Sequence, residues 1–257
     1  MRFQAVCTFF LCACAALSPA QAQTGDLHAP WDRLLAAYVA PGPDGVNRVD
    51  YAAWRNDAAD REALGRYIET LEAQQVSEFG AEAAFAYWAN LYNAVTVRLI
   101  LDEAPERSIR QIRPHLFAIG PWGVERVTVE GEALSLDDIE HEIMRERFEA
   151  AMVHYAVNCA SIGCPNLKRT AWRAEGLEAA LDAAARAYVN HPRGVTVTAD
   201  GVLVSRIYKW FREDFGGSQA GVLDHLLAYA EPRLAEEIRA KPHIDGHAYD
   251  WSLNRPD

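Results

Sequence analysis

The sequence predicts an α+β fold, a predominantly helical single domain around a small antiparallel sheet, over residues 23–257. Residues 81–101 are apolar on nearly every side, as in a helix that runs through the middle of a domain. Several brief alternating segments are joined by turn residues, which is typical of antiparallel hairpins. No Ser/Gly-rich linker, heptad or repeat divides these residues. Together these observations favour one mixed domain over two.

The first elements are expected to be mainly helical. Residues 30–40 carry apolar side chains at helical spacing, and Pro30 suits the first turn of a helix. A turn cluster at 41–45 and a brief alternation at 46–51 follow. Residues 60–74 again place their apolar side chains on one face, which predicts a second amphipathic helix.

The second half is expected to mix hairpins and helices. Residues 124–129 alternate before a Glu-Gly-Glu turn, and Ser135 is placed to cap a helix. Residues 152–158 are rich in β-forming side chains and predict a strand, although a short helix fits so brief a run nearly as well. The other expected elements are helices at 175–189, 207–215 and 220–229, a hairpin at 195–205, and a final strand at 249–254.

Composition excludes two classes of partner. The chain has 36 acidic and 25 basic residues, which gives a formal charge of −11 and a pI near 5.2. Such a chain has no general attraction for phosphate backbones, so we expect no nucleic-acid partner. Charged residues interrupt every long apolar run after the first thirty residues, so we expect no membrane insertion once the leader is removed. A small molecule or a peptide remains as the expected partner, and the oligomeric state is left open.

The first 22 residues have the pattern of an export signal. Arg2 precedes an apolar run at 3–17, and small residues lead up to Ala22, as signal peptidase requires. We expect cleavage after Ala22 and export to the periplasm or the medium. The stretch Leu11–Cys14 weakly resembles a lipobox, which leaves a lipid anchor as an alternative. A buried N-terminal helix is a further alternative.

Cleavage would leave Cys159 and Cys164 as the two cysteines of the mature chain. In an oxidising compartment two nearby thiols tend to form a disulfide, here closing a six-residue loop. A thiolate is also a good nucleophile when a base or cation lies beside it, which makes Cys159 a candidate catalytic residue. A zinc site built from both cysteines with His141 and His154 is a third alternative.

Three residues could assist a reactive thiol. His154 lies five residues before Cys159, so contact between imidazole and sulfur is geometrically feasible without being required. Glu140 and His141 provide a second acid–base pair. Consecutive residues on a regular helix diverge by about 100°, so both would face one site only if the helix were distorted.

Four polar residues are expected to support the site. Asn90 and Asn93 lie one turn apart on the apolar 81–101 helix, where a buried amide must find hydrogen-bond partners. An amide can hold the backbone of a neighbouring loop as readily as it can hold a substrate, and we favour the structural role. Asn158 and Ser161 flank the first cysteine and are expected to shape its loop.

Several motifs occur in a fixed order: Trp88–Ala94, Leu134–His141, His154–Pro165 and Tyr249–Asn254. They resemble the domain-of-unknown-function family 547, over most of the chain from about residue 81 to 254. An exported bacterial protein with little else attached is a common form of this family. The resemblance implies no particular activity, cofactor or ligand. Its motifs do include the residues that chemistry selects: both cysteines, His154, Glu140, His141, Asn90 and Asn93.

These observations lead to one hypothesis and two rivals. The leading hypothesis is a thiol-dependent acyl or amide hydrolase or transferase, in which Cys159 attacks, His154 or His141 is the base, and Glu140 orients an imidazole. The first rival is a non-enzymatic envelope binding module stapled by a Cys159–Cys164 disulfide. The second is a zinc or redox protein. The enzyme hypothesis requires one sulfur to lie beside one imidazole in a concave site.

Overall fold

The structure is a computed structural model that describes residues 26–115 and 120–256. The export signal expected at residues 1–22, with its three cysteines, lies outside the described residues. The helices are α1 (Ala29–Tyr38), α2 (Tyr51–Asn56), α3 (Ala58–Glu72), α4 (Ala81–Glu103), α5 (Arg145–Arg147), α6 (Ala150–Ala156), α7 (Leu177–Val189), α8 (Ile207–Trp210), α9 (Gln219–Tyr229) and α10 (Pro232–Ala240). Short 3₁₀ turns occur at Val76–Glu78, Ile109–Gln111 and Arg212–Phe215, and a π-helical segment, η3, at Asp138–Met144.

The strands form three small sheets. β1 (Val39–Pro41) pairs with β2 (Asn47–Val49), and β3 (Val127–Val129) pairs with β4 (Glu132–Leu134), both antiparallel. β5 (Val195–Val197) and β6 (Val202–Ser205) form a third antiparallel hairpin, and β7 (Ile244–Ala248) joins β6 in parallel. The predicted fold class, α+β and mostly helical with small antiparallel sheets, is confirmed.

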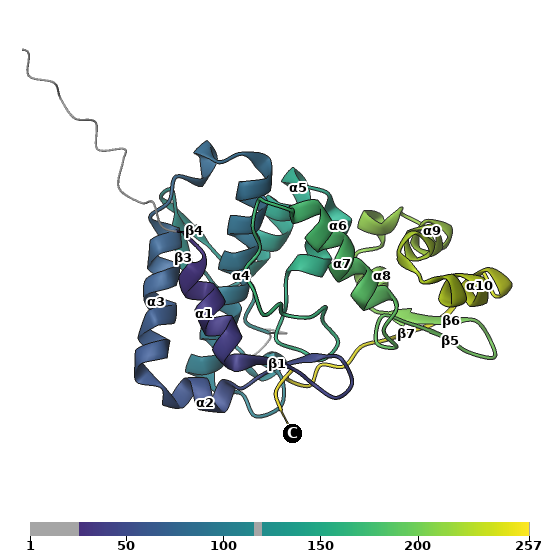
Figure 1. The fold of residues 1–257 in the computed structure, drawn as a ribbon, viewed down its shortest axis with the longest axis horizontal. Helices are drawn as coiled ribbons and strands as arrows, with labels where there is room; N and C mark the ends of the chain where they lie inside the picture. The colour runs from purple at the N-terminus through teal and green to yellow at the C-terminus, as the bar shows by residue number, and fades with distance from the viewer. Residues whose placement is uncertain (1–25, 116–119, 257) are drawn as a thin grey trace, which may run out of the picture.

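Helix α4 is the centre of the packing. Its side chains from Phe85 to Leu101 are buried except for Arg98, so a helix that is apolar on all sides has neighbours on all sides. Figure 1 shows α1 and α3 at one end of the molecule, and α9 and α10 with the β5–β6–β7 sheet at the other. The segment that carries the cysteines runs between these two ends. None of the helices described here combines the length and apolarity needed to cross a bilayer.

Two of the predicted strands are wrong. Residues 152–158 are mostly helical, because α6 covers Ala150–Ala156 and the Val157 N–H donates to the Val153 carbonyl. Every side chain from Ala151 to Ala156 is buried, so its apolar run reflects burial on all sides and not the two faces of a strand. The final strand lies at Ile244–Ala248, just before the predicted 249–254.

The segment 249–254 has another role in the fold. Its backbone runs beside the cysteine loop, where the Ile162 and Gly163 N–H groups donate to the Ser252 and Asp250 carbonyls over 2.8 Å each. An isolated antiparallel β-bridge pairs Ser161 with Leu253. The alternating pattern therefore marks a segment that pairs with a loop in place of a sheet. Helices α2 and α10 were not predicted.

Candidate functional site

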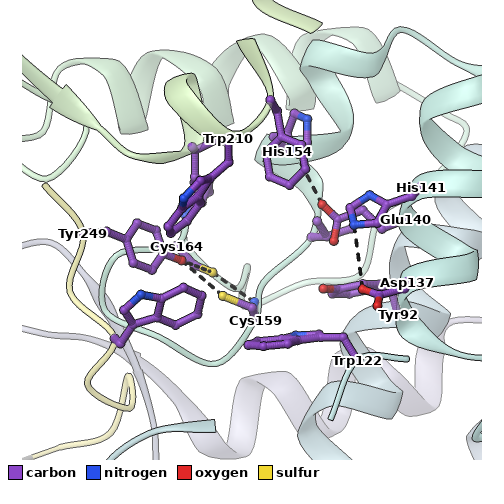
Figure 2. A pocket seen from close by; sticks show the side chains of 15 residues that line it. Tyr92, Trp122, Asp137, Glu140, His141, His154, Cys159, Cys164, Trp210 and Tyr249 are labelled. Atoms are coloured by element: carbon purple, nitrogen blue, oxygen red, sulfur yellow. Dashed lines mark hydrogen bonds and ion pairs between the residues drawn. The ribbon is translucent and has the colours of Figure 1, made fainter. Parts of the chain in front are cut away.

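A cavity of about 200 Å³ opens between the cysteine loop, η3 and the segments around α8 and 249–251 (Figure 2). It brings together residues that are far apart in the chain. The two cysteines, Trp210 and Tyr249 lie on one side, and Glu140 and His141 lie on the other. The lining residues are Tyr92, Trp122, Asp137, Glu140, His141, His154, Val157, Cys159, Cys164, Pro165, Ile207, Trp210, Phe211, Tyr249 and Trp251.

The cysteine loop is held in place by side-chain amides. Asn93 on α4 donates to the Ala156 carbonyl over 2.9 Å and accepts from the Asn158 N–H over 2.8 Å. The Asn158 side chain donates to the Pro165 carbonyl over 2.7 Å and accepts from the Ala160 N–H over 2.9 Å, so it spans the loop that contains both cysteines. These contacts support the structural role expected for Asn93 and Asn158.

Asn90 supports a neighbouring segment. Its amide donates to the carbonyl of Trp172 and accepts from the N–H of the same residue, each over 2.9 Å. It is fully buried and does not line the cavity. The two amides that the sequence places one turn apart on α4 therefore fix two different loops.

The backbone of the cysteine loop is constrained. Ala160 has a φ of 60°, in the left-handed region that costs energy for a residue with a side chain. At Gly163, a Cβ atom would lie 2.9 Å from the Asp250 carbonyl oxygen and 2.9 Å from the Tyr249 ring. Glycine is therefore required where the loop meets the 249–254 segment, and this contact brings Tyr249 to the sulfurs.

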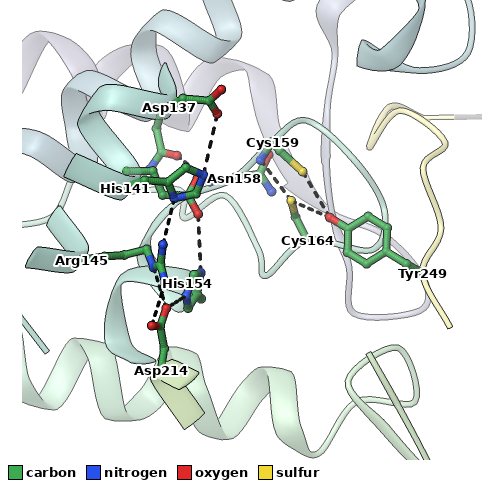
Figure 3. Close-up of polar contacts among 11 residues, drawn as sticks. Asp137, His141, Arg145, His154, Asn158, Cys159, Cys164, Asp214 and Tyr249 are labelled. Atoms are coloured by element: carbon green, nitrogen blue, oxygen red, sulfur yellow. Dashed lines mark hydrogen bonds and ion pairs between the residues drawn. The ribbon is translucent and has the colours of Figure 1, made fainter. Parts of the chain in front are cut away.

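Cys159 and Cys164 approach each other to 2.5 Å, and no disulfide joins them in this structure. Tyr249 Oη is 3.2 Å from Cys159 Sγ and 3.1 Å from Cys164 Sγ (Figure 3). Ser161 Oγ lies 3.2 Å and 3.6 Å from the same two sulfurs. In addition, the Cys159 backbone N–H donates to Cys164 Sγ over 3.0 Å. Cys164 thus has one donor that Cys159 lacks.

This asymmetry separates the two thiols. Burial alone raises the pKa of Cys164, but hydrogen bonds from Cys159, Tyr249 and Ser161 outweigh it and lower the pKa to about 6. The hydrogen bond that Cys159 gives to Cys164, together with burial, raises the pKa of Cys159 well above its usual range. The donors therefore favour the thiolate at Cys164 over the thiolate at Cys159.

A buried ionic cluster lies on the other side of the cavity. His154 Nε2 is 2.6 Å from Asp214 Oδ2, and its Nδ1 is 3.5 Å from Glu140 Oε1. Arg145 binds Asp214 through two hydrogen bonds of 2.6 and 2.8 Å. The His154 ring also stacks on Phe211 with centroids 4.2 Å apart. The imidazole is therefore fixed at both nitrogens and on one face.

The charges in this cluster stabilise one another. Burial lowers the pKa of His154, but its hydrogen bonds to Asp214 and Glu140 outweigh that effect and raise it. Burial raises the pKa of Asp214, but His154 and Arg145 lower it well below its usual range. The pKa of Glu140 is likewise lowered, because contacts with His154, His141 and Tyr92 outweigh burial. The cluster is thus best described as ionised.

The π-helical segment explains how Glu140 and His141 share the site. A continuous helical stretch from 136 to 147 widens between Asp138 and Met144, and such wide turns occur often at functional sites. Both side chains line the cavity, which a regular helix would not allow for neighbours. His141 Nε2 lies 3.7 Å from Asp137 Oδ1, and His141 Nδ1 lies 3.4 Å from Arg145 Nη1. It has 30% of its side chain exposed, so it is the more accessible imidazole.

The comparison of this chain with known proteins gives a family. The family model described as "Protein of unknown function, DUF547" matches residues 76–189. This segment of the chain is therefore similar to the DUF547 family. No curated protein and no solved structure gives a significant match.

The DUF547 segment contains most of the predicted site. Both cysteines, His154, Glu140, His141 and the two α4 amides lie within residues 76–189. Several cavity or cluster residues come from outside it: Asp214, Trp210, Phe211, Tyr249 and Trp251. The site is therefore built from the DUF547 segment and from the C-terminal part of the chain. The motif at 249–254 was part of the resemblance, but the match to the family model ends before it.

The structure does not form the sulfur–imidazole contact on which the hydrolase hypothesis depends. The polar contacts of the sulfurs are with each other, Ser161 and Tyr249, and those of His154 are with two carboxylates. Cysteines and histidines line one cavity from opposite sides (Figure 2). Among the described residues, no group of three or more His, Cys, Asp or Glu side chains is arranged to hold a metal ion, so the proposed zinc ligands are not gathered.

Sequence reasoning missed the residues that complete each half of the site. Asp214 is 60 residues from His154, and Tyr249 is 85 residues from Cys164. The Tyr-Asp-Trp motif at 249–251 was noted, but as a strand. Trp122 and Trp210 had no signal beyond their residue type, and Asp137 was noted only as part of the Leu134–His141 motif.

Proposed function

We propose that this protein is a thiol–disulfide exchange enzyme in which Cys164 is the attacking thiolate and Cys159 is the resolving thiol. The observation that carries the proposal is the position of Cys164 Sγ, which receives a backbone N–H at 3.0 Å and a tyrosine hydroxyl at 3.1 Å beside a second thiol. These donors stabilise the negative sulfur, and the cavity gives a small substrate access to it.

The exchange balances without a further reactant. Cys164 S⁻ forms a bond to one sulfur of a small disulfide, and the other sulfur leaves as a thiolate, which takes the proton of Cys159. Cys159 S⁻ then attacks Cys164 Sγ, which forms the Cys159–Cys164 disulfide and releases the second thiolate. The substrate is reduced by two electrons, and the dithiol is oxidised by two. A dithiol substrate drives the same steps in reverse.

The geometry supports exchange better than acyl transfer. Hydrolysis by Cys159 would need a base that takes the thiol proton, and no imidazole contacts either sulfur among the hydrogen bonds of the described residues. Acyl transfer remains as a second candidate, because His141 lines the same cavity opposite the thiolate and could protonate a leaving group held between them. In that case too, Cys164 replaces Cys159 as the proposed nucleophile.

Export is part of the same proposal. The leader expected at residues 1–22 would deliver the chain to a compartment where disulfides form and persist. A reversible Cys159–Cys164 disulfide would have substrates there. A permanent disulfide would instead make the protein the stapled binding module.

The test is to trap the mixed disulfide. We expect the full-length Cys159→Ser protein, mixed with 2-hydroxyethyl disulfide, to accumulate one mercaptoethanol adduct on Cys164, because no resolving thiol remains. The wild-type protein should instead pass to the internal disulfide. Both cysteines fall in tryptic peptide 148–168, so mass spectrometry of this peptide separates the adduct from a product lighter by two hydrogens.

The matched control is Cys164→Ser, in which Cys159 should form the adduct much more slowly. An adduct that forms equally fast on either remaining cysteine would contradict the assigned roles. No adduct on either variant would contradict exchange altogether.

A further inference from the structure

We infer that the cavity beside the thiols binds a small organic cation, so that the substrate is a disulfide or thiol that carries an alkylammonium group. The binding site stands on its own observations, and the substrate class rests on the proposed function. Two features of the cavity carry the inference: its aromatic wall and its excess of acidic groups.

The aromatic wall is formed by Trp122, Trp210, Trp251 and Tyr249. Figure 2 shows Trp122, Trp210 and Tyr249 around the cavity. Tyr249 and Trp251 have ring centroids 4.7 Å apart, and Trp210 lies 4.9 Å from Tyr249 and 5.5 Å from Trp251. Trp122 is 5.8 Å from Trp251. The rings are inclined to one another by 36° to 60°, so they form a curved surface and not a stack. Curved aromatic surfaces of this kind recognise quaternary ammonium groups through the negative ring faces.

Trp210 is the residue of this wall that is exposed to solvent. It has 43% of its surface exposed and is the one exposed large apolar side chain among the described residues. Together with the neighbouring Tyr249 and Trp251 rings it forms a continuous apolar surface at the cavity, and such a surface is typical of a ligand contact. Arg110 already places its guanidinium 5.1 Å from the centre of the Trp251 ring, although it does not line the cavity, which shows that this ring has a cation beside it.

The charged residues of the cavity leave a negative balance. Asp137, Glu140 and Cys164 line it, and no Lys or Arg does so among the described residues. Glu140 is offset by His154, and the nearby Arg145 is bound to Asp214. Asp137 and the Cys164 thiolate are therefore left without a full positive partner.

Asp137 lies at the rim, with 52% of its side chain exposed. Its pKa is raised, because the partial burial of the carboxylate outweighs the attraction of His141, whose Nε2 lies 3.7 Å away. A bound ammonium group would supply the missing charge. An ammonium group beside Asp137 would lie across the cavity from the cysteines (Figure 2). The rest of an aminothiol disulfide would then extend along the aromatic wall and bring its sulfur toward Cys164.

The site is tested first with a ligand that has no sulfur. We expect choline to bind the full-length protein at least about tenfold more tightly than its neutral isostere 3,3-dimethylbutan-1-ol, as measured by calorimetry. Trp210→Ala should weaken choline binding about fivefold or more, and Asp137→Asn about threefold. Glu142→Gln removes the same charge from an exposed position on the same helix and should leave binding unchanged.

Equal binding of choline and the neutral alcohol, or absence of choline binding, would overturn the cation site. Binding of N-acetylglucosamine without choline would also overturn it, because the aromatic wall would then be a sugar platform. Each of these results is independent of the redox chemistry.

The substrate class is tested with two disulfides of similar size. We expect the reduced protein to react with cystamine at least about tenfold faster than with neutral 2-hydroxyethyl disulfide. Each rate is divided by the rate of the same disulfide with a small free thiol, which removes the difference between leaving groups. Asp137→Asn should reduce the preference, and Glu142→Gln should not. If choline binds and this preference is absent, the substrate class is wrong. If neither disulfide reacts, the proposed function fails, while the choline result still decides the cation site.

Discussion

Replacing Asp214 by Asn is expected to lower the free energy of unfolding by about 3 kcal/mol near pH 6. The substitution removes the charge that binds both His154 and Arg145, at side chains that are 2% and 24% exposed. A buried ion that loses its partner usually costs about 3 to 5 kcal/mol, and we place this case at the lower end because the imidazole can release its proton. Urea unfolding followed by circular dichroism measures the change.

The loss should depend on pH in a defined direction. The pKa of His154 is raised in the folded protein, so the stability that its charge contributes is complete below the ordinary pKa of about 6.5 and is lost as the pH rises through the folded value. The free energy of unfolding lost in the Asp214→Asn variant should therefore be larger at about pH 6 than at about pH 9. Below about pH 4 the free energy of unfolding of the wild type should also fall. The fold stabilises the charged form of Asp214, as its lowered pKa indicates, and acid neutralises that charge.

The matched control is Asp224→Asn, which removes an exposed carboxylate from α9. We expect it to change stability by no more than about 0.5 kcal/mol. An Asp214→Asn variant as stable as this control would mean that the cluster around His154 contributes nothing to the stability of the fold. If the difference in free energy of unfolding between the variant and the wild type grew with pH, the imidazole would be neutral in the folded protein.

The pH dependence of alkylation should identify the thiolate. In the Cys159→Ser variant, Cys164 keeps its backbone N–H and tyrosine donors, so we expect its reaction with iodoacetamide to rise with a midpoint between about pH 6 and 7. In the Cys164→Ser variant, Cys159 has no thiolate beside it and lacks that backbone donor, so its midpoint should lie near or above the ordinary value of about 8.5.

At about pH 7 this difference should make Cys164 at least about tenfold more reactive than Cys159. The rates are read from tryptic peptide 148–168, because that peptide separates the two sites from the cysteines of the leader. Tyr249→Phe in the Cys159→Ser background should move the midpoint upward, since it removes one of the donors to sulfur. If the lower midpoint belonged to Cys159, the assigned roles would be reversed.

The sequence predicted the parts of the fold that depend on local pattern. The apolar run at 81–101 required a buried helix, and α4 is that helix. Its two asparagines required buried partners, and both bind loop backbone. The hairpin at 195–205 also followed from its alternation and its turn. In each case, the residues that decide the structure are neighbours in the chain.

The site was predicted only in part, because its chemistry depends on tertiary contacts. The cysteines and the acid–base residues were identified by type, and they do line one cavity. Their partners were not, since Asp214 and Tyr249 come from segments whose packing no local pattern reveals. His154 was expected to serve Cys159, but α6 replaces the predicted strand and places the imidazole between carboxylates. The π-helical turn that brings Glu140 and His141 to one cavity was likewise beyond a period-based argument.

The central claim is that the two cysteines form a reversible couple in the folded protein. The most direct test is to equilibrate the full-length wild-type protein with mixtures of 2-mercaptoethanol and its disulfide, quench with acid, and alkylate. Peptide 148–168 should then change from doubly alkylated to internally disulfide-bonded as the mixture becomes more oxidising, and it should return along the same curve when the mixture is reversed. A peptide that stays doubly alkylated, or that stays disulfide-bonded until the protein is unfolded, would contradict the account.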